Sequence, residues 1–206
     1  DVQDKVTHTG MPVRPAVAAM RARAYPSLAG AGPIELLVLG GSQGAQVFSE
    51  VIPEAVGQLA DGLRCRLRVT QQCRSENLEG ARRRYRELGV EADLAAFFDD
   101  VPERLARAHL LITRAGASSV AEITAVGRPA ILVPYPFAVD DHQTANAHAM
   151  DEVGAGWLMP QEAFTPRALA ARLDALFDLP ATLEKTAVSA RAAGRADAAA
   201  CLADVV

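Results

Sequence analysis

Several features that mark specialised classes of protein are scarce in this sequence of 206 residues. The three cysteines are odd in number and irregularly spaced, so they predict neither a disulfide framework nor a zinc knuckle, and they favour a reducing compartment. The four histidines lack the spacing of metal ligands, so we expect no metal and no other cofactor. No stretch approaches the roughly 18 consecutive apolar residues of a membrane-spanning helix, which predicts no transmembrane segment.

Concentrated positive charge is also lacking, since the net charge is −4. The arginines at 82–84 and at 64, 66 and 68 are interpreted as solvated faces of the protein. Proteins that bind nucleic acid usually gather their positive charge on one surface. We therefore expect no nucleic-acid partner.

The length and composition, with 50% hydrophobic and 22% charged residues, are typical of one large globular domain. The sequence opens on Asp1 without a methionine, which suggests a fragment of a longer protein. Several prolines and glycines surround a short Ala-rich piece in residues 7–33. Residues 1–33 are therefore predicted to be a linker with one or two helical turns, and residues 34–206 the domain itself.

Compact apolar runs alternate with helix-like segments from residue 34 onward, and such runs are typical of buried strands. Strands that alternate with helices at this spacing imply right-handed crossovers and a parallel sheet covered on both faces. The predicted fold class is therefore doubly wound α/β, or Rossmann-like. The expected strands are 34–39, 64–70, 92–98, 110–114 and 130–134, with an edge strand at 154–158 and helices from 165 to the end, interrupted near Leu179-Pro180.

Loops with small or polar residues follow four of these strands, at 40–45, 98–100, 114–119 and 135–143. Ligands of doubly wound sheets bind beyond the carboxyl ends of the strands, where all four loops would lie. In the first loop, glycines allow a ligand to approach the backbone closely, and Ser42 offers a hydroxyl group to a phosphate or sugar. The alternative is that these glycines serve only a tight turn.

The segment Thr113–Glu122 carries the strongest indication of a ligand. It joins an apolar run to an Ala-rich helix, where free N–H groups and the positive end of the helix dipole favour a phosphate. Glu122 lies about one turn into that helix, where its carboxylate can accept hydrogen bonds from two ribose hydroxyls. Together these features predict a nucleoside diphosphate. The alternative is that Ser119 and Glu122 form only a capping box.

His142 and Gln143 are predicted to open a further helix after the loop at 135–143, with Asp140 or Asp141 as its cap. Side chains in the first turn of that helix would project toward the same crevice as the other loops. They could hydrogen-bond sugar hydroxyls or a phosphate. The alternative is ordinary polarity at the start of a helix.

Five motifs follow one another along the chain in a specific order and spacing. They are Gly10-Met11-Pro12-Val13-Arg14, Gly40-Gly41-Ser42-Gln43-Gly44-Ala45, Arg114-Ala115-Gly116-Ala117 running to Glu122, Gly127-x-Pro129-Ala130-Ile131-Leu132-Val133-Pro134, and Asp141-His142-Gln143-x-x-Asn146-Ala147. This set resembles the MurG family of glycosyltransferases, which is family 28 and has the GT-B fold. The resemblance covers essentially the whole chain as the C-terminal half of a two-domain enzyme. Two positions depart from it: Met11 stands where the family often has Asn, and His142 where some members have Gln.

The resemblance implies a domain that binds UDP-N-acetylglucosamine. Under this resemblance, Glu122 binds the ribose, and the backbone of Ala117 through Ser119, at the N-terminus of the same helix, holds the diphosphate. The backbone of Phe98 reads the uracil. Arg14 and Ser42 add contacts to the nucleoside or diphosphate. Gln143 touches the sugar hydroxyls with His142 beside it. The implied binding residues are Arg14, Ser42, Phe98, Ala117, Ser118, Ser119, Val120, Ala121, Glu122, His142 and Gln143.

The resemblance further implies transfer of N-acetylglucosamine, with inversion and without a required metal, to undecaprenyl-pyrophosphoryl-MurNAc-pentapeptide at the cytoplasmic face of a bacterial membrane. It assigns the general base and the acceptor site to an N-terminal domain that these 206 residues do not contain. We therefore expect no catalytic residue here and an inactive fragment. The alternatives are the donor domain of another UDP- or dTDP-sugar transferase, a UDP-sugar epimerase, and a nucleotide-binding module without chemistry.

Overall fold

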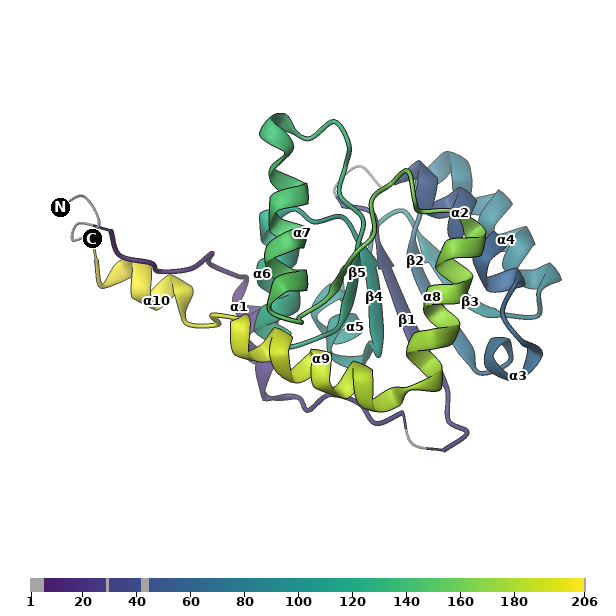
Figure 1. The fold of residues 1–206 in the computed structure, drawn as a ribbon, viewed down its shortest axis with the longest axis horizontal. Helices are drawn as coiled ribbons and strands as arrows, with labels where there is room; N and C mark the ends of the chain where they lie inside the picture. Colours follow the sequence, from purple (N-terminus) through teal and green to yellow (C-terminus); the bar gives the residue numbers. More distant parts are fainter. Residues whose placement is uncertain (1–5, 29, 42–44, 206) are drawn as a thin grey trace.

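The chain folds around one six-stranded sheet in a computed structural model that describes residues 6–28, 30–41 and 45–205 (Figure 1). The strand order is β3-β2-β1-β4-β5-β6, and every pair of neighbours is parallel. The strands are β1 Ile34–Leu39, β2 Leu67–Gln72, β3 Glu91–Ala95, β4 Leu110–Thr113, β5 Ala130–Leu132 and β6 Trp157–Leu158. This sheet, with helices on both faces, confirms the predicted doubly wound α/β class and the edge strand at its end.

Helices fill the connections between the strands and continue after the last one. The α-helices are α1 Pro15–Ala19, α2 Gln46–Gly57, α3 Asp61–Arg64, α4 Leu78–Glu87, α5 Val101–Arg107, α6 Ala117–Val126, α7 His142–Glu152, α8 Pro166–Asp178, α9 Pro180–Ala193 and α10 Ala198–Ala203, and the 3-10 helices are η2 Met20–Ala22, η3 Ser75–Asn77 and η4 Val139–Asp141. Pro180 begins α9, so the predicted interruption of the C-terminal helices near Leu179-Pro180 is confirmed.

Successive side chains of the central strand enter two different cores. Leu36 and Val38 of β1 join a cluster with Phe48 of α2, whereas Leu37 packs on the other face with Ile123 of α6. Successive residues of a strand point to opposite faces, so a strand covered by helices on both faces must be apolar throughout. This requirement explains the uninterrupted apolar run that predicted the strand.

The chain reverses its direction across the sheet between β1 and β4, which are neighbours. From β1 it moves outward through β2 to β3, then returns beside β1 and continues outward through β5 to β6. The loops that leave β1 and β4 therefore lie side by side at the carboxyl edge of the sheet. Such a reversal is the usual place for a ligand in this class of fold.

The segment before the sheet packs against the domain. Val17 is fully buried in the core beside α6. Arg21 donates hydrogen bonds to the carbonyl groups of Ala125 and Arg191, both at 3.0 Å. The helical turns predicted within residues 7–33 are confirmed as α1 and η2, while the predicted domain boundary at residue 33 stays a prediction.

The strands predicted at 110–114, 130–134 and 154–158 are shorter in the structure, and two others, now Leu67–Gln72 and Glu91–Ala95, are displaced. The strand expected at 64–70 begins only at Leu67, because residues 61–64 form α3. The strand expected at 92–98 ends at Ala95, and Phe98 lies in the loop that follows it. Neither difference changes the order of the elements or the edge at which their loops lie.

His109 makes the stability of the fold depend on pH. Its side chain is 5% exposed, and Nδ1 accepts a hydrogen bond from the Glu35 N–H at 2.9 Å. Burial lowers the pKa of His109; the backbone of Ser27 raises it, and the nearby charges of Arg128 and Arg66 lower it. The unfolded chain therefore takes up a proton near pH 6.5, before the folded chain does, and stability falls as the pH drops below that value.

We expect the free energy of unfolding, measured by urea titration, to be lower at about pH 5.5 than at about pH 7.5. In His109→Asn the fall should be smaller, because the amide oxygen can accept the same hydrogen bond without titrating. An equal fall in both proteins would assign the pH dependence to other groups.

Candidate functional site

A cavity of 780 Å³ opens at the carboxyl edge of the sheet, where β1 and β4 lie side by side. Its walls come from the loop after β1, the start of α6 after β4, the loop after β5 and the residues after β6. These loops include three of the four that the sequence marked as candidates. The volume lies within the range of pockets that hold small organic ligands.

The start of α6 supplies the wall beside β4. Gly116 is the N-cap residue, and no side chain caps the helix. The first backbone bond within the helix runs from the Val120 N–H to the Gly116 carbonyl at 3.0 Å, so the N–H groups of Ala117, Ser118 and Ser119 belong to the open first turn. All three residues line the cavity. The dipole of this ten-residue helix favours an anion at this place.

The structure contradicts the capping-box alternative. A capping box needs Ser119 at the N-cap and Glu122 three residues into the helix. The helix instead begins two residues before Ser119, and Gly116 occupies the N-cap. The Glu122 carboxylate faces another segment of the chain, so its position requires an explanation other than capping.

Glu122 pairs with Arg14, the residue before α1. Nε of Arg14 lies 2.8 Å from one carboxylate oxygen and Nη2 lies 3.1 Å from the other, which is the two-pronged geometry of an arginine and a carboxylate. The hydrogen bond to Glu122 raises the pKa of Arg14. The Glu122 side chain is 19% exposed and that of Arg14 is 55% exposed, so a ligand can reach the pair. Two residues that the sequence assigned to one ligand, 108 positions apart, are thus in contact.

Gln143 and His142 begin α7, and both are tied to the loop that precedes it. Oε1 of Gln143 accepts a hydrogen bond from the Tyr135 N–H at 3.0 Å, and Nδ1 of His142 lies 2.7 Å from the Val139 carbonyl oxygen. Gln143 lines the cavity and keeps its amide N–H groups for a ligand. Asp141 occupies the predicted cap position, but its carboxylate accepts from the Thr144 hydroxyl and does not cap the backbone.

Phe98 lies in the loop after β3, at the same edge of the sheet, but the strands β2 and β1 lie between β3 and β4. Its ring is 7% exposed, and the Arg104 guanidinium lies 4.1 Å from the ring centre. Arg104 is held in turn by Asp93 and Asp100. The side chain is thus fixed within the protein, and the predicted role of the Phe98 backbone stays a prediction.

The predicted binding residues therefore divide into three groups. Four of them line the cavity: Ala117, Ser118, Ser119 and Gln143. Six lie outside the described lining: Arg14, Phe98, Val120, Ala121, Glu122 and His142. Ser42 lies outside the residues that the structure describes, so its predicted contact has no counterpart here.

Among the further residues that line the cavity, the sequence analysis assigned no ligand to Arg114, Tyr135 and Gln161. Arg114 opens one of the recurring motifs, and Tyr135 begins a loop that was already marked. Gln161 follows the short edge strand, in a stretch without a glycine turn or any other signal. Only the tertiary structure brings it to the site.

Two kinds of site are not found within the described ranges of the chain. Among these residues, no group of three or more His, Cys, Asp and Glu is arranged to hold a metal ion. None of the helices there is long and apolar enough to cross a membrane.

Comparison with known proteins identifies a family and a set of close relatives. Residues 35–202 match the model described as glycosyltransferase family 28 C-terminal domain. A protein of Paramagnetospirillum magneticum is 63% identical over 202 residues, which are 98% of this chain and 54% of that protein. A protein of Rhodospirillum centenum is 57% identical over 98% of this chain and 53% of that protein. Both are named UDP-N-acetylglucosamine–N-acetylmuramyl-(pentapeptide) pyrophosphoryl-undecaprenol N-acetylglucosamine transferase, and this chain spans about half of their length.

Solved structures agree with this family. The crystal structure of Acinetobacter baumannii MurG matches with a TM-score of 0.79 and 32% identity over 88% of this chain and 54% of that one. WaaG, a glycosyltransferase involved in lipopolysaccharide biosynthesis, matches with a TM-score of 0.66 and 18% identity over 88% of this chain and 50% of that one. The second match shows a shared fold only.

Proposed function

Because the chain belongs to the glycosyltransferase family 28 C-terminal domain family, we propose that it binds the sugar donor of a UDP-N-acetylglucosamine transferase. The observation that carries this proposal is the open first turn of α6 on the wall of the 780 Å³ cavity. That turn offers backbone N–H groups and a positive dipole end to a diphosphate. Glu122 lies on the same helix, one turn further on, where its carboxylate would accept hydrogen bonds from the ribose hydroxyls.

The reaction that we propose for the whole protein is the one in the names of its relatives. N-acetylglucosamine would pass from UDP to undecaprenyl-pyrophosphoryl-MurNAc-pentapeptide, which converts lipid I to lipid II in peptidoglycan synthesis. The acceptor hydroxyl attacks the anomeric carbon with inversion, and UDP leaves with the electron pair of the broken bond. The general base and the acceptor site would lie in the other half of the relatives' length, so we expect this chain alone to bind the donor and to transfer nothing.

We assign the donor as the family resemblance implies. Glu122 would hold the ribose, the first turn of α6 the diphosphate, and Gln143 with His142 the sugar. Arg14, Ser42 and the backbone of Phe98 would complete the nucleoside and phosphate contacts. Helix dipole and N–H donors would stabilise the departing diphosphate without a metal. Because the proposed acceptor carries undecaprenol, we expect the whole protein to act peripherally at the cytoplasmic face of the cell membrane.

Calorimetric titration with UDP, UDP-N-acetylglucosamine and dTDP tests the proposed function. The two uridine ligands should bind at least about tenfold more tightly than dTDP, which lacks the 2′-hydroxyl that Glu122 would accept from. Equal affinity for UDP and dTDP would contradict a uridine-specific donor site. Transfer of sugar to a lipid-linked acceptor by this chain alone would contradict the division of labour between the two halves.

A further inference from the structure

Arg114 forms part of the cavity wall and is held there by several contacts. Its Nη1 donates to the carbonyl groups of Val133 at 3.1 Å and Pro134 at 3.0 Å, and its Nη2 donates to Oε1 of Gln161 at 2.7 Å. The guanidinium also lies 5.4 Å from the centre of the Tyr135 ring. These contacts fix the direction of the guanidinium in a half-buried position.

No carboxylate of the described residues forms an ion pair with Arg114, although burial removes water from its charge and lowers its pKa. Two other arginines make the contrast clear. Arg104, also partly buried, pairs with Asp93 and Asp100. Arg128 directs five hydrogen bonds to backbone carbonyl groups. Arg128 therefore also lacks an opposite charge within the described ranges, but Arg114 donates to three oxygen atoms against five for Arg128, and it lies at the cavity wall. A desolvated cation without an opposite charge is costly, so the positive charge of Arg114 is available to a ligand.

The other charges at the cavity do not cancel that of Arg114. Arg74 and Glu50 also line it, and Arg74 forms an ion pair with Glu76 at 3.9 Å. The Glu50 carboxylate accepts a hydrogen bond from the Gln46 amide at 2.6 Å. The open first turn of α6 adds its positive dipole end to the same cavity. An anion is therefore the ligand that this wall favours.

We propose that Arg114 supplies the charged donor for the diphosphate of the bound nucleotide and that Gln161 is its positioning residue. The proposal rests on the function proposed above and adds to the backbone N–H groups of α6 a side chain for the same ligand. Guanidinium and phosphate form short, charge-assisted hydrogen bonds, which would offset the desolvation of Arg114. The neutral Gln161 amide holds the guanidinium and leaves its charge in place. A carboxylate at this position would neutralise that charge.

Calorimetry with inorganic pyrophosphate, UDP and uridine tests the proposal on the whole chain. Arg114→Met should weaken pyrophosphate and UDP by roughly 10- to 100-fold and leave uridine within about threefold. Arg114→Lys keeps the charge but loses the planar fork of the guanidinium. Its affinity for pyrophosphate should lie between those of the wild type and Arg114→Met. Gln161→Glu should raise the denaturation midpoint, because it neutralises a half-buried cation, and should weaken pyrophosphate by a comparable factor.

The Gln161→Glu variant tests the role of Arg114 even if Arg114→Met does not fold, because it retains the arginine. Unchanged pyrophosphate affinity in Gln161→Glu, or equal losses for UDP and uridine in Arg114→Met, would overturn the role of Arg114. If wild-type chain binds pyrophosphate through Arg114 but shows no preference for UDP over dTDP, the proposed function fails and this inference stands. If the wild-type chain prefers UDP over dTDP and the Arg114 variants bind UDP with normal affinity, the proposed function stands and the role of Arg114 fails.

Discussion

Arg128→Met is expected to lower the free energy of unfolding by more than about 4 kcal/mol, out of a total of about 5–15 kcal/mol for a domain of this kind. Arg128 is 1% exposed and lies between the ends of two helices. Nη1 donates to the carbonyl groups of Val126, the last residue of α6, and of its C-cap Gly127, while Nε and Nη2 donate to those of Leu105 and Ala106 in the last turn of α5. Nη2 also reaches the Ala24 carbonyl at 3.1 Å, in the segment before the sheet.

The size of this effect follows from what the side chain satisfies. The last carbonyl groups of a helix have no partner within it and carry the negative end of its dipole. Arg128 supplies donors to two such ends at once, and burial lowers its pKa only to about 10, so it remains charged at neutral pH. Methionine fills a similar volume but removes the donor of five carbonyl groups, of which, in the described part of the chain, only that of Leu105 keeps another donor, the Ala108 N–H at 3.3 Å. Each carbonyl group left without a donor costs about 1–3 kcal/mol if it stays buried.

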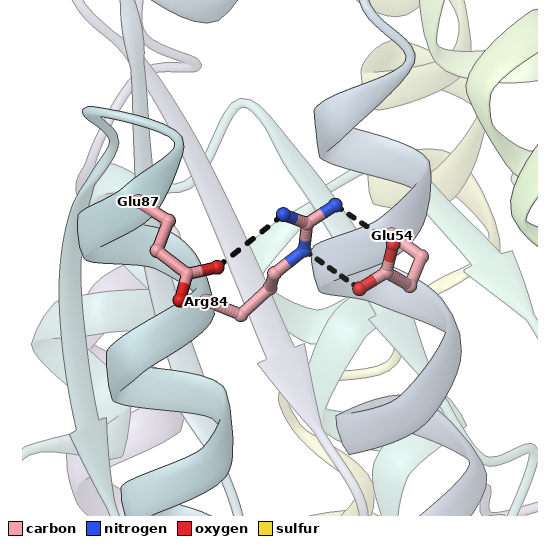
Figure 2. A network of polar contacts seen from close by, with 3 residues as sticks. All are labelled: Glu54, Arg84 and Glu87. Carbon is pink, nitrogen blue, oxygen red and sulfur yellow. Dashed lines mark hydrogen bonds and ion pairs between the residues drawn. The ribbon is translucent and has the colours of Figure 1, made fainter.

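Chemical denaturation at neutral pH measures the effect, with Arg84→Met as the matched control. Arg84 bridges α2 and α4 through Glu54 and also contacts Glu87, as Figure 2 shows, but this network lies in solvent. Exposed ion pairs contribute little, so the control should move the midpoint only slightly. Similar midpoints for the two variants would show that the carbonyl groups around Arg128 find water instead.

Glu122→Ala is expected to weaken UDP binding by at least about 100-fold, which is the largest effect we predict on the proposed function. Two hydrogen bonds from ribose hydroxyls to a carboxylate would be lost, and bonds to a charged group contribute about 1.5–3 kcal/mol each. The Arg14 pair seen in the structure would also disappear. Titration with UDP measures the loss, and Glu122→Gln, with one acceptor oxygen in place of two, should fall between wild type and alanine.

Ser119→Ala is the control for local helix effects. Ser119 lies on the same helix as Glu122. We expect Ser119→Ala to retain the fold, because Gly116, and not Ser119, is the N-cap of α6. Its hydroxyl could contact a phosphate, so a modest loss of UDP affinity is compatible with the proposal, whereas a loss equal to that of Glu122→Ala is not. UDP affinity within about threefold of wild type in Glu122→Ala would remove Glu122 from the ribose site.

The sequence came close to the fold because local patterns were consistent with it. The apolar run that became β1 is buried on both faces, and α6 begins at Ala117, within the segment Thr113–Glu122 that was predicted to lead from a strand into a helix. Where local patterns were ambiguous the boundaries moved: of the strand predicted at 64–70, Arg64 ends α3, residues 65–66 form a turn and β2 begins at Leu67. A charged, alternating stretch can serve either as a strand or as a short helix until its neighbours are placed.

The candidate site was only partly accessible to the same reasoning. Loops that follow strands share an edge of a parallel sheet, so Ala117, Ser118, Ser119 and Gln143 could be placed together from order alone. The contact between Arg14 and Glu122 joins segments 108 residues apart and depends on how α1 packs against α6. Gln161 has no local signal, because its role arises from the side chain that it meets.

By itself, the sequence determined the class of fold, the edge of the sheet where the cavity lies and the helix whose first turn lines it. These properties follow from hydrophobic periodicity and chain order, which are local or topological. The tertiary structure alone decided which side chains share the cavity, why Ser119 and Glu122 are not a capping box, and that an arginine without a carboxylate partner among the described residues, Arg114, lies at the cavity wall. Burial and pairing are relations between distant residues, and they exist only once the chain has folded.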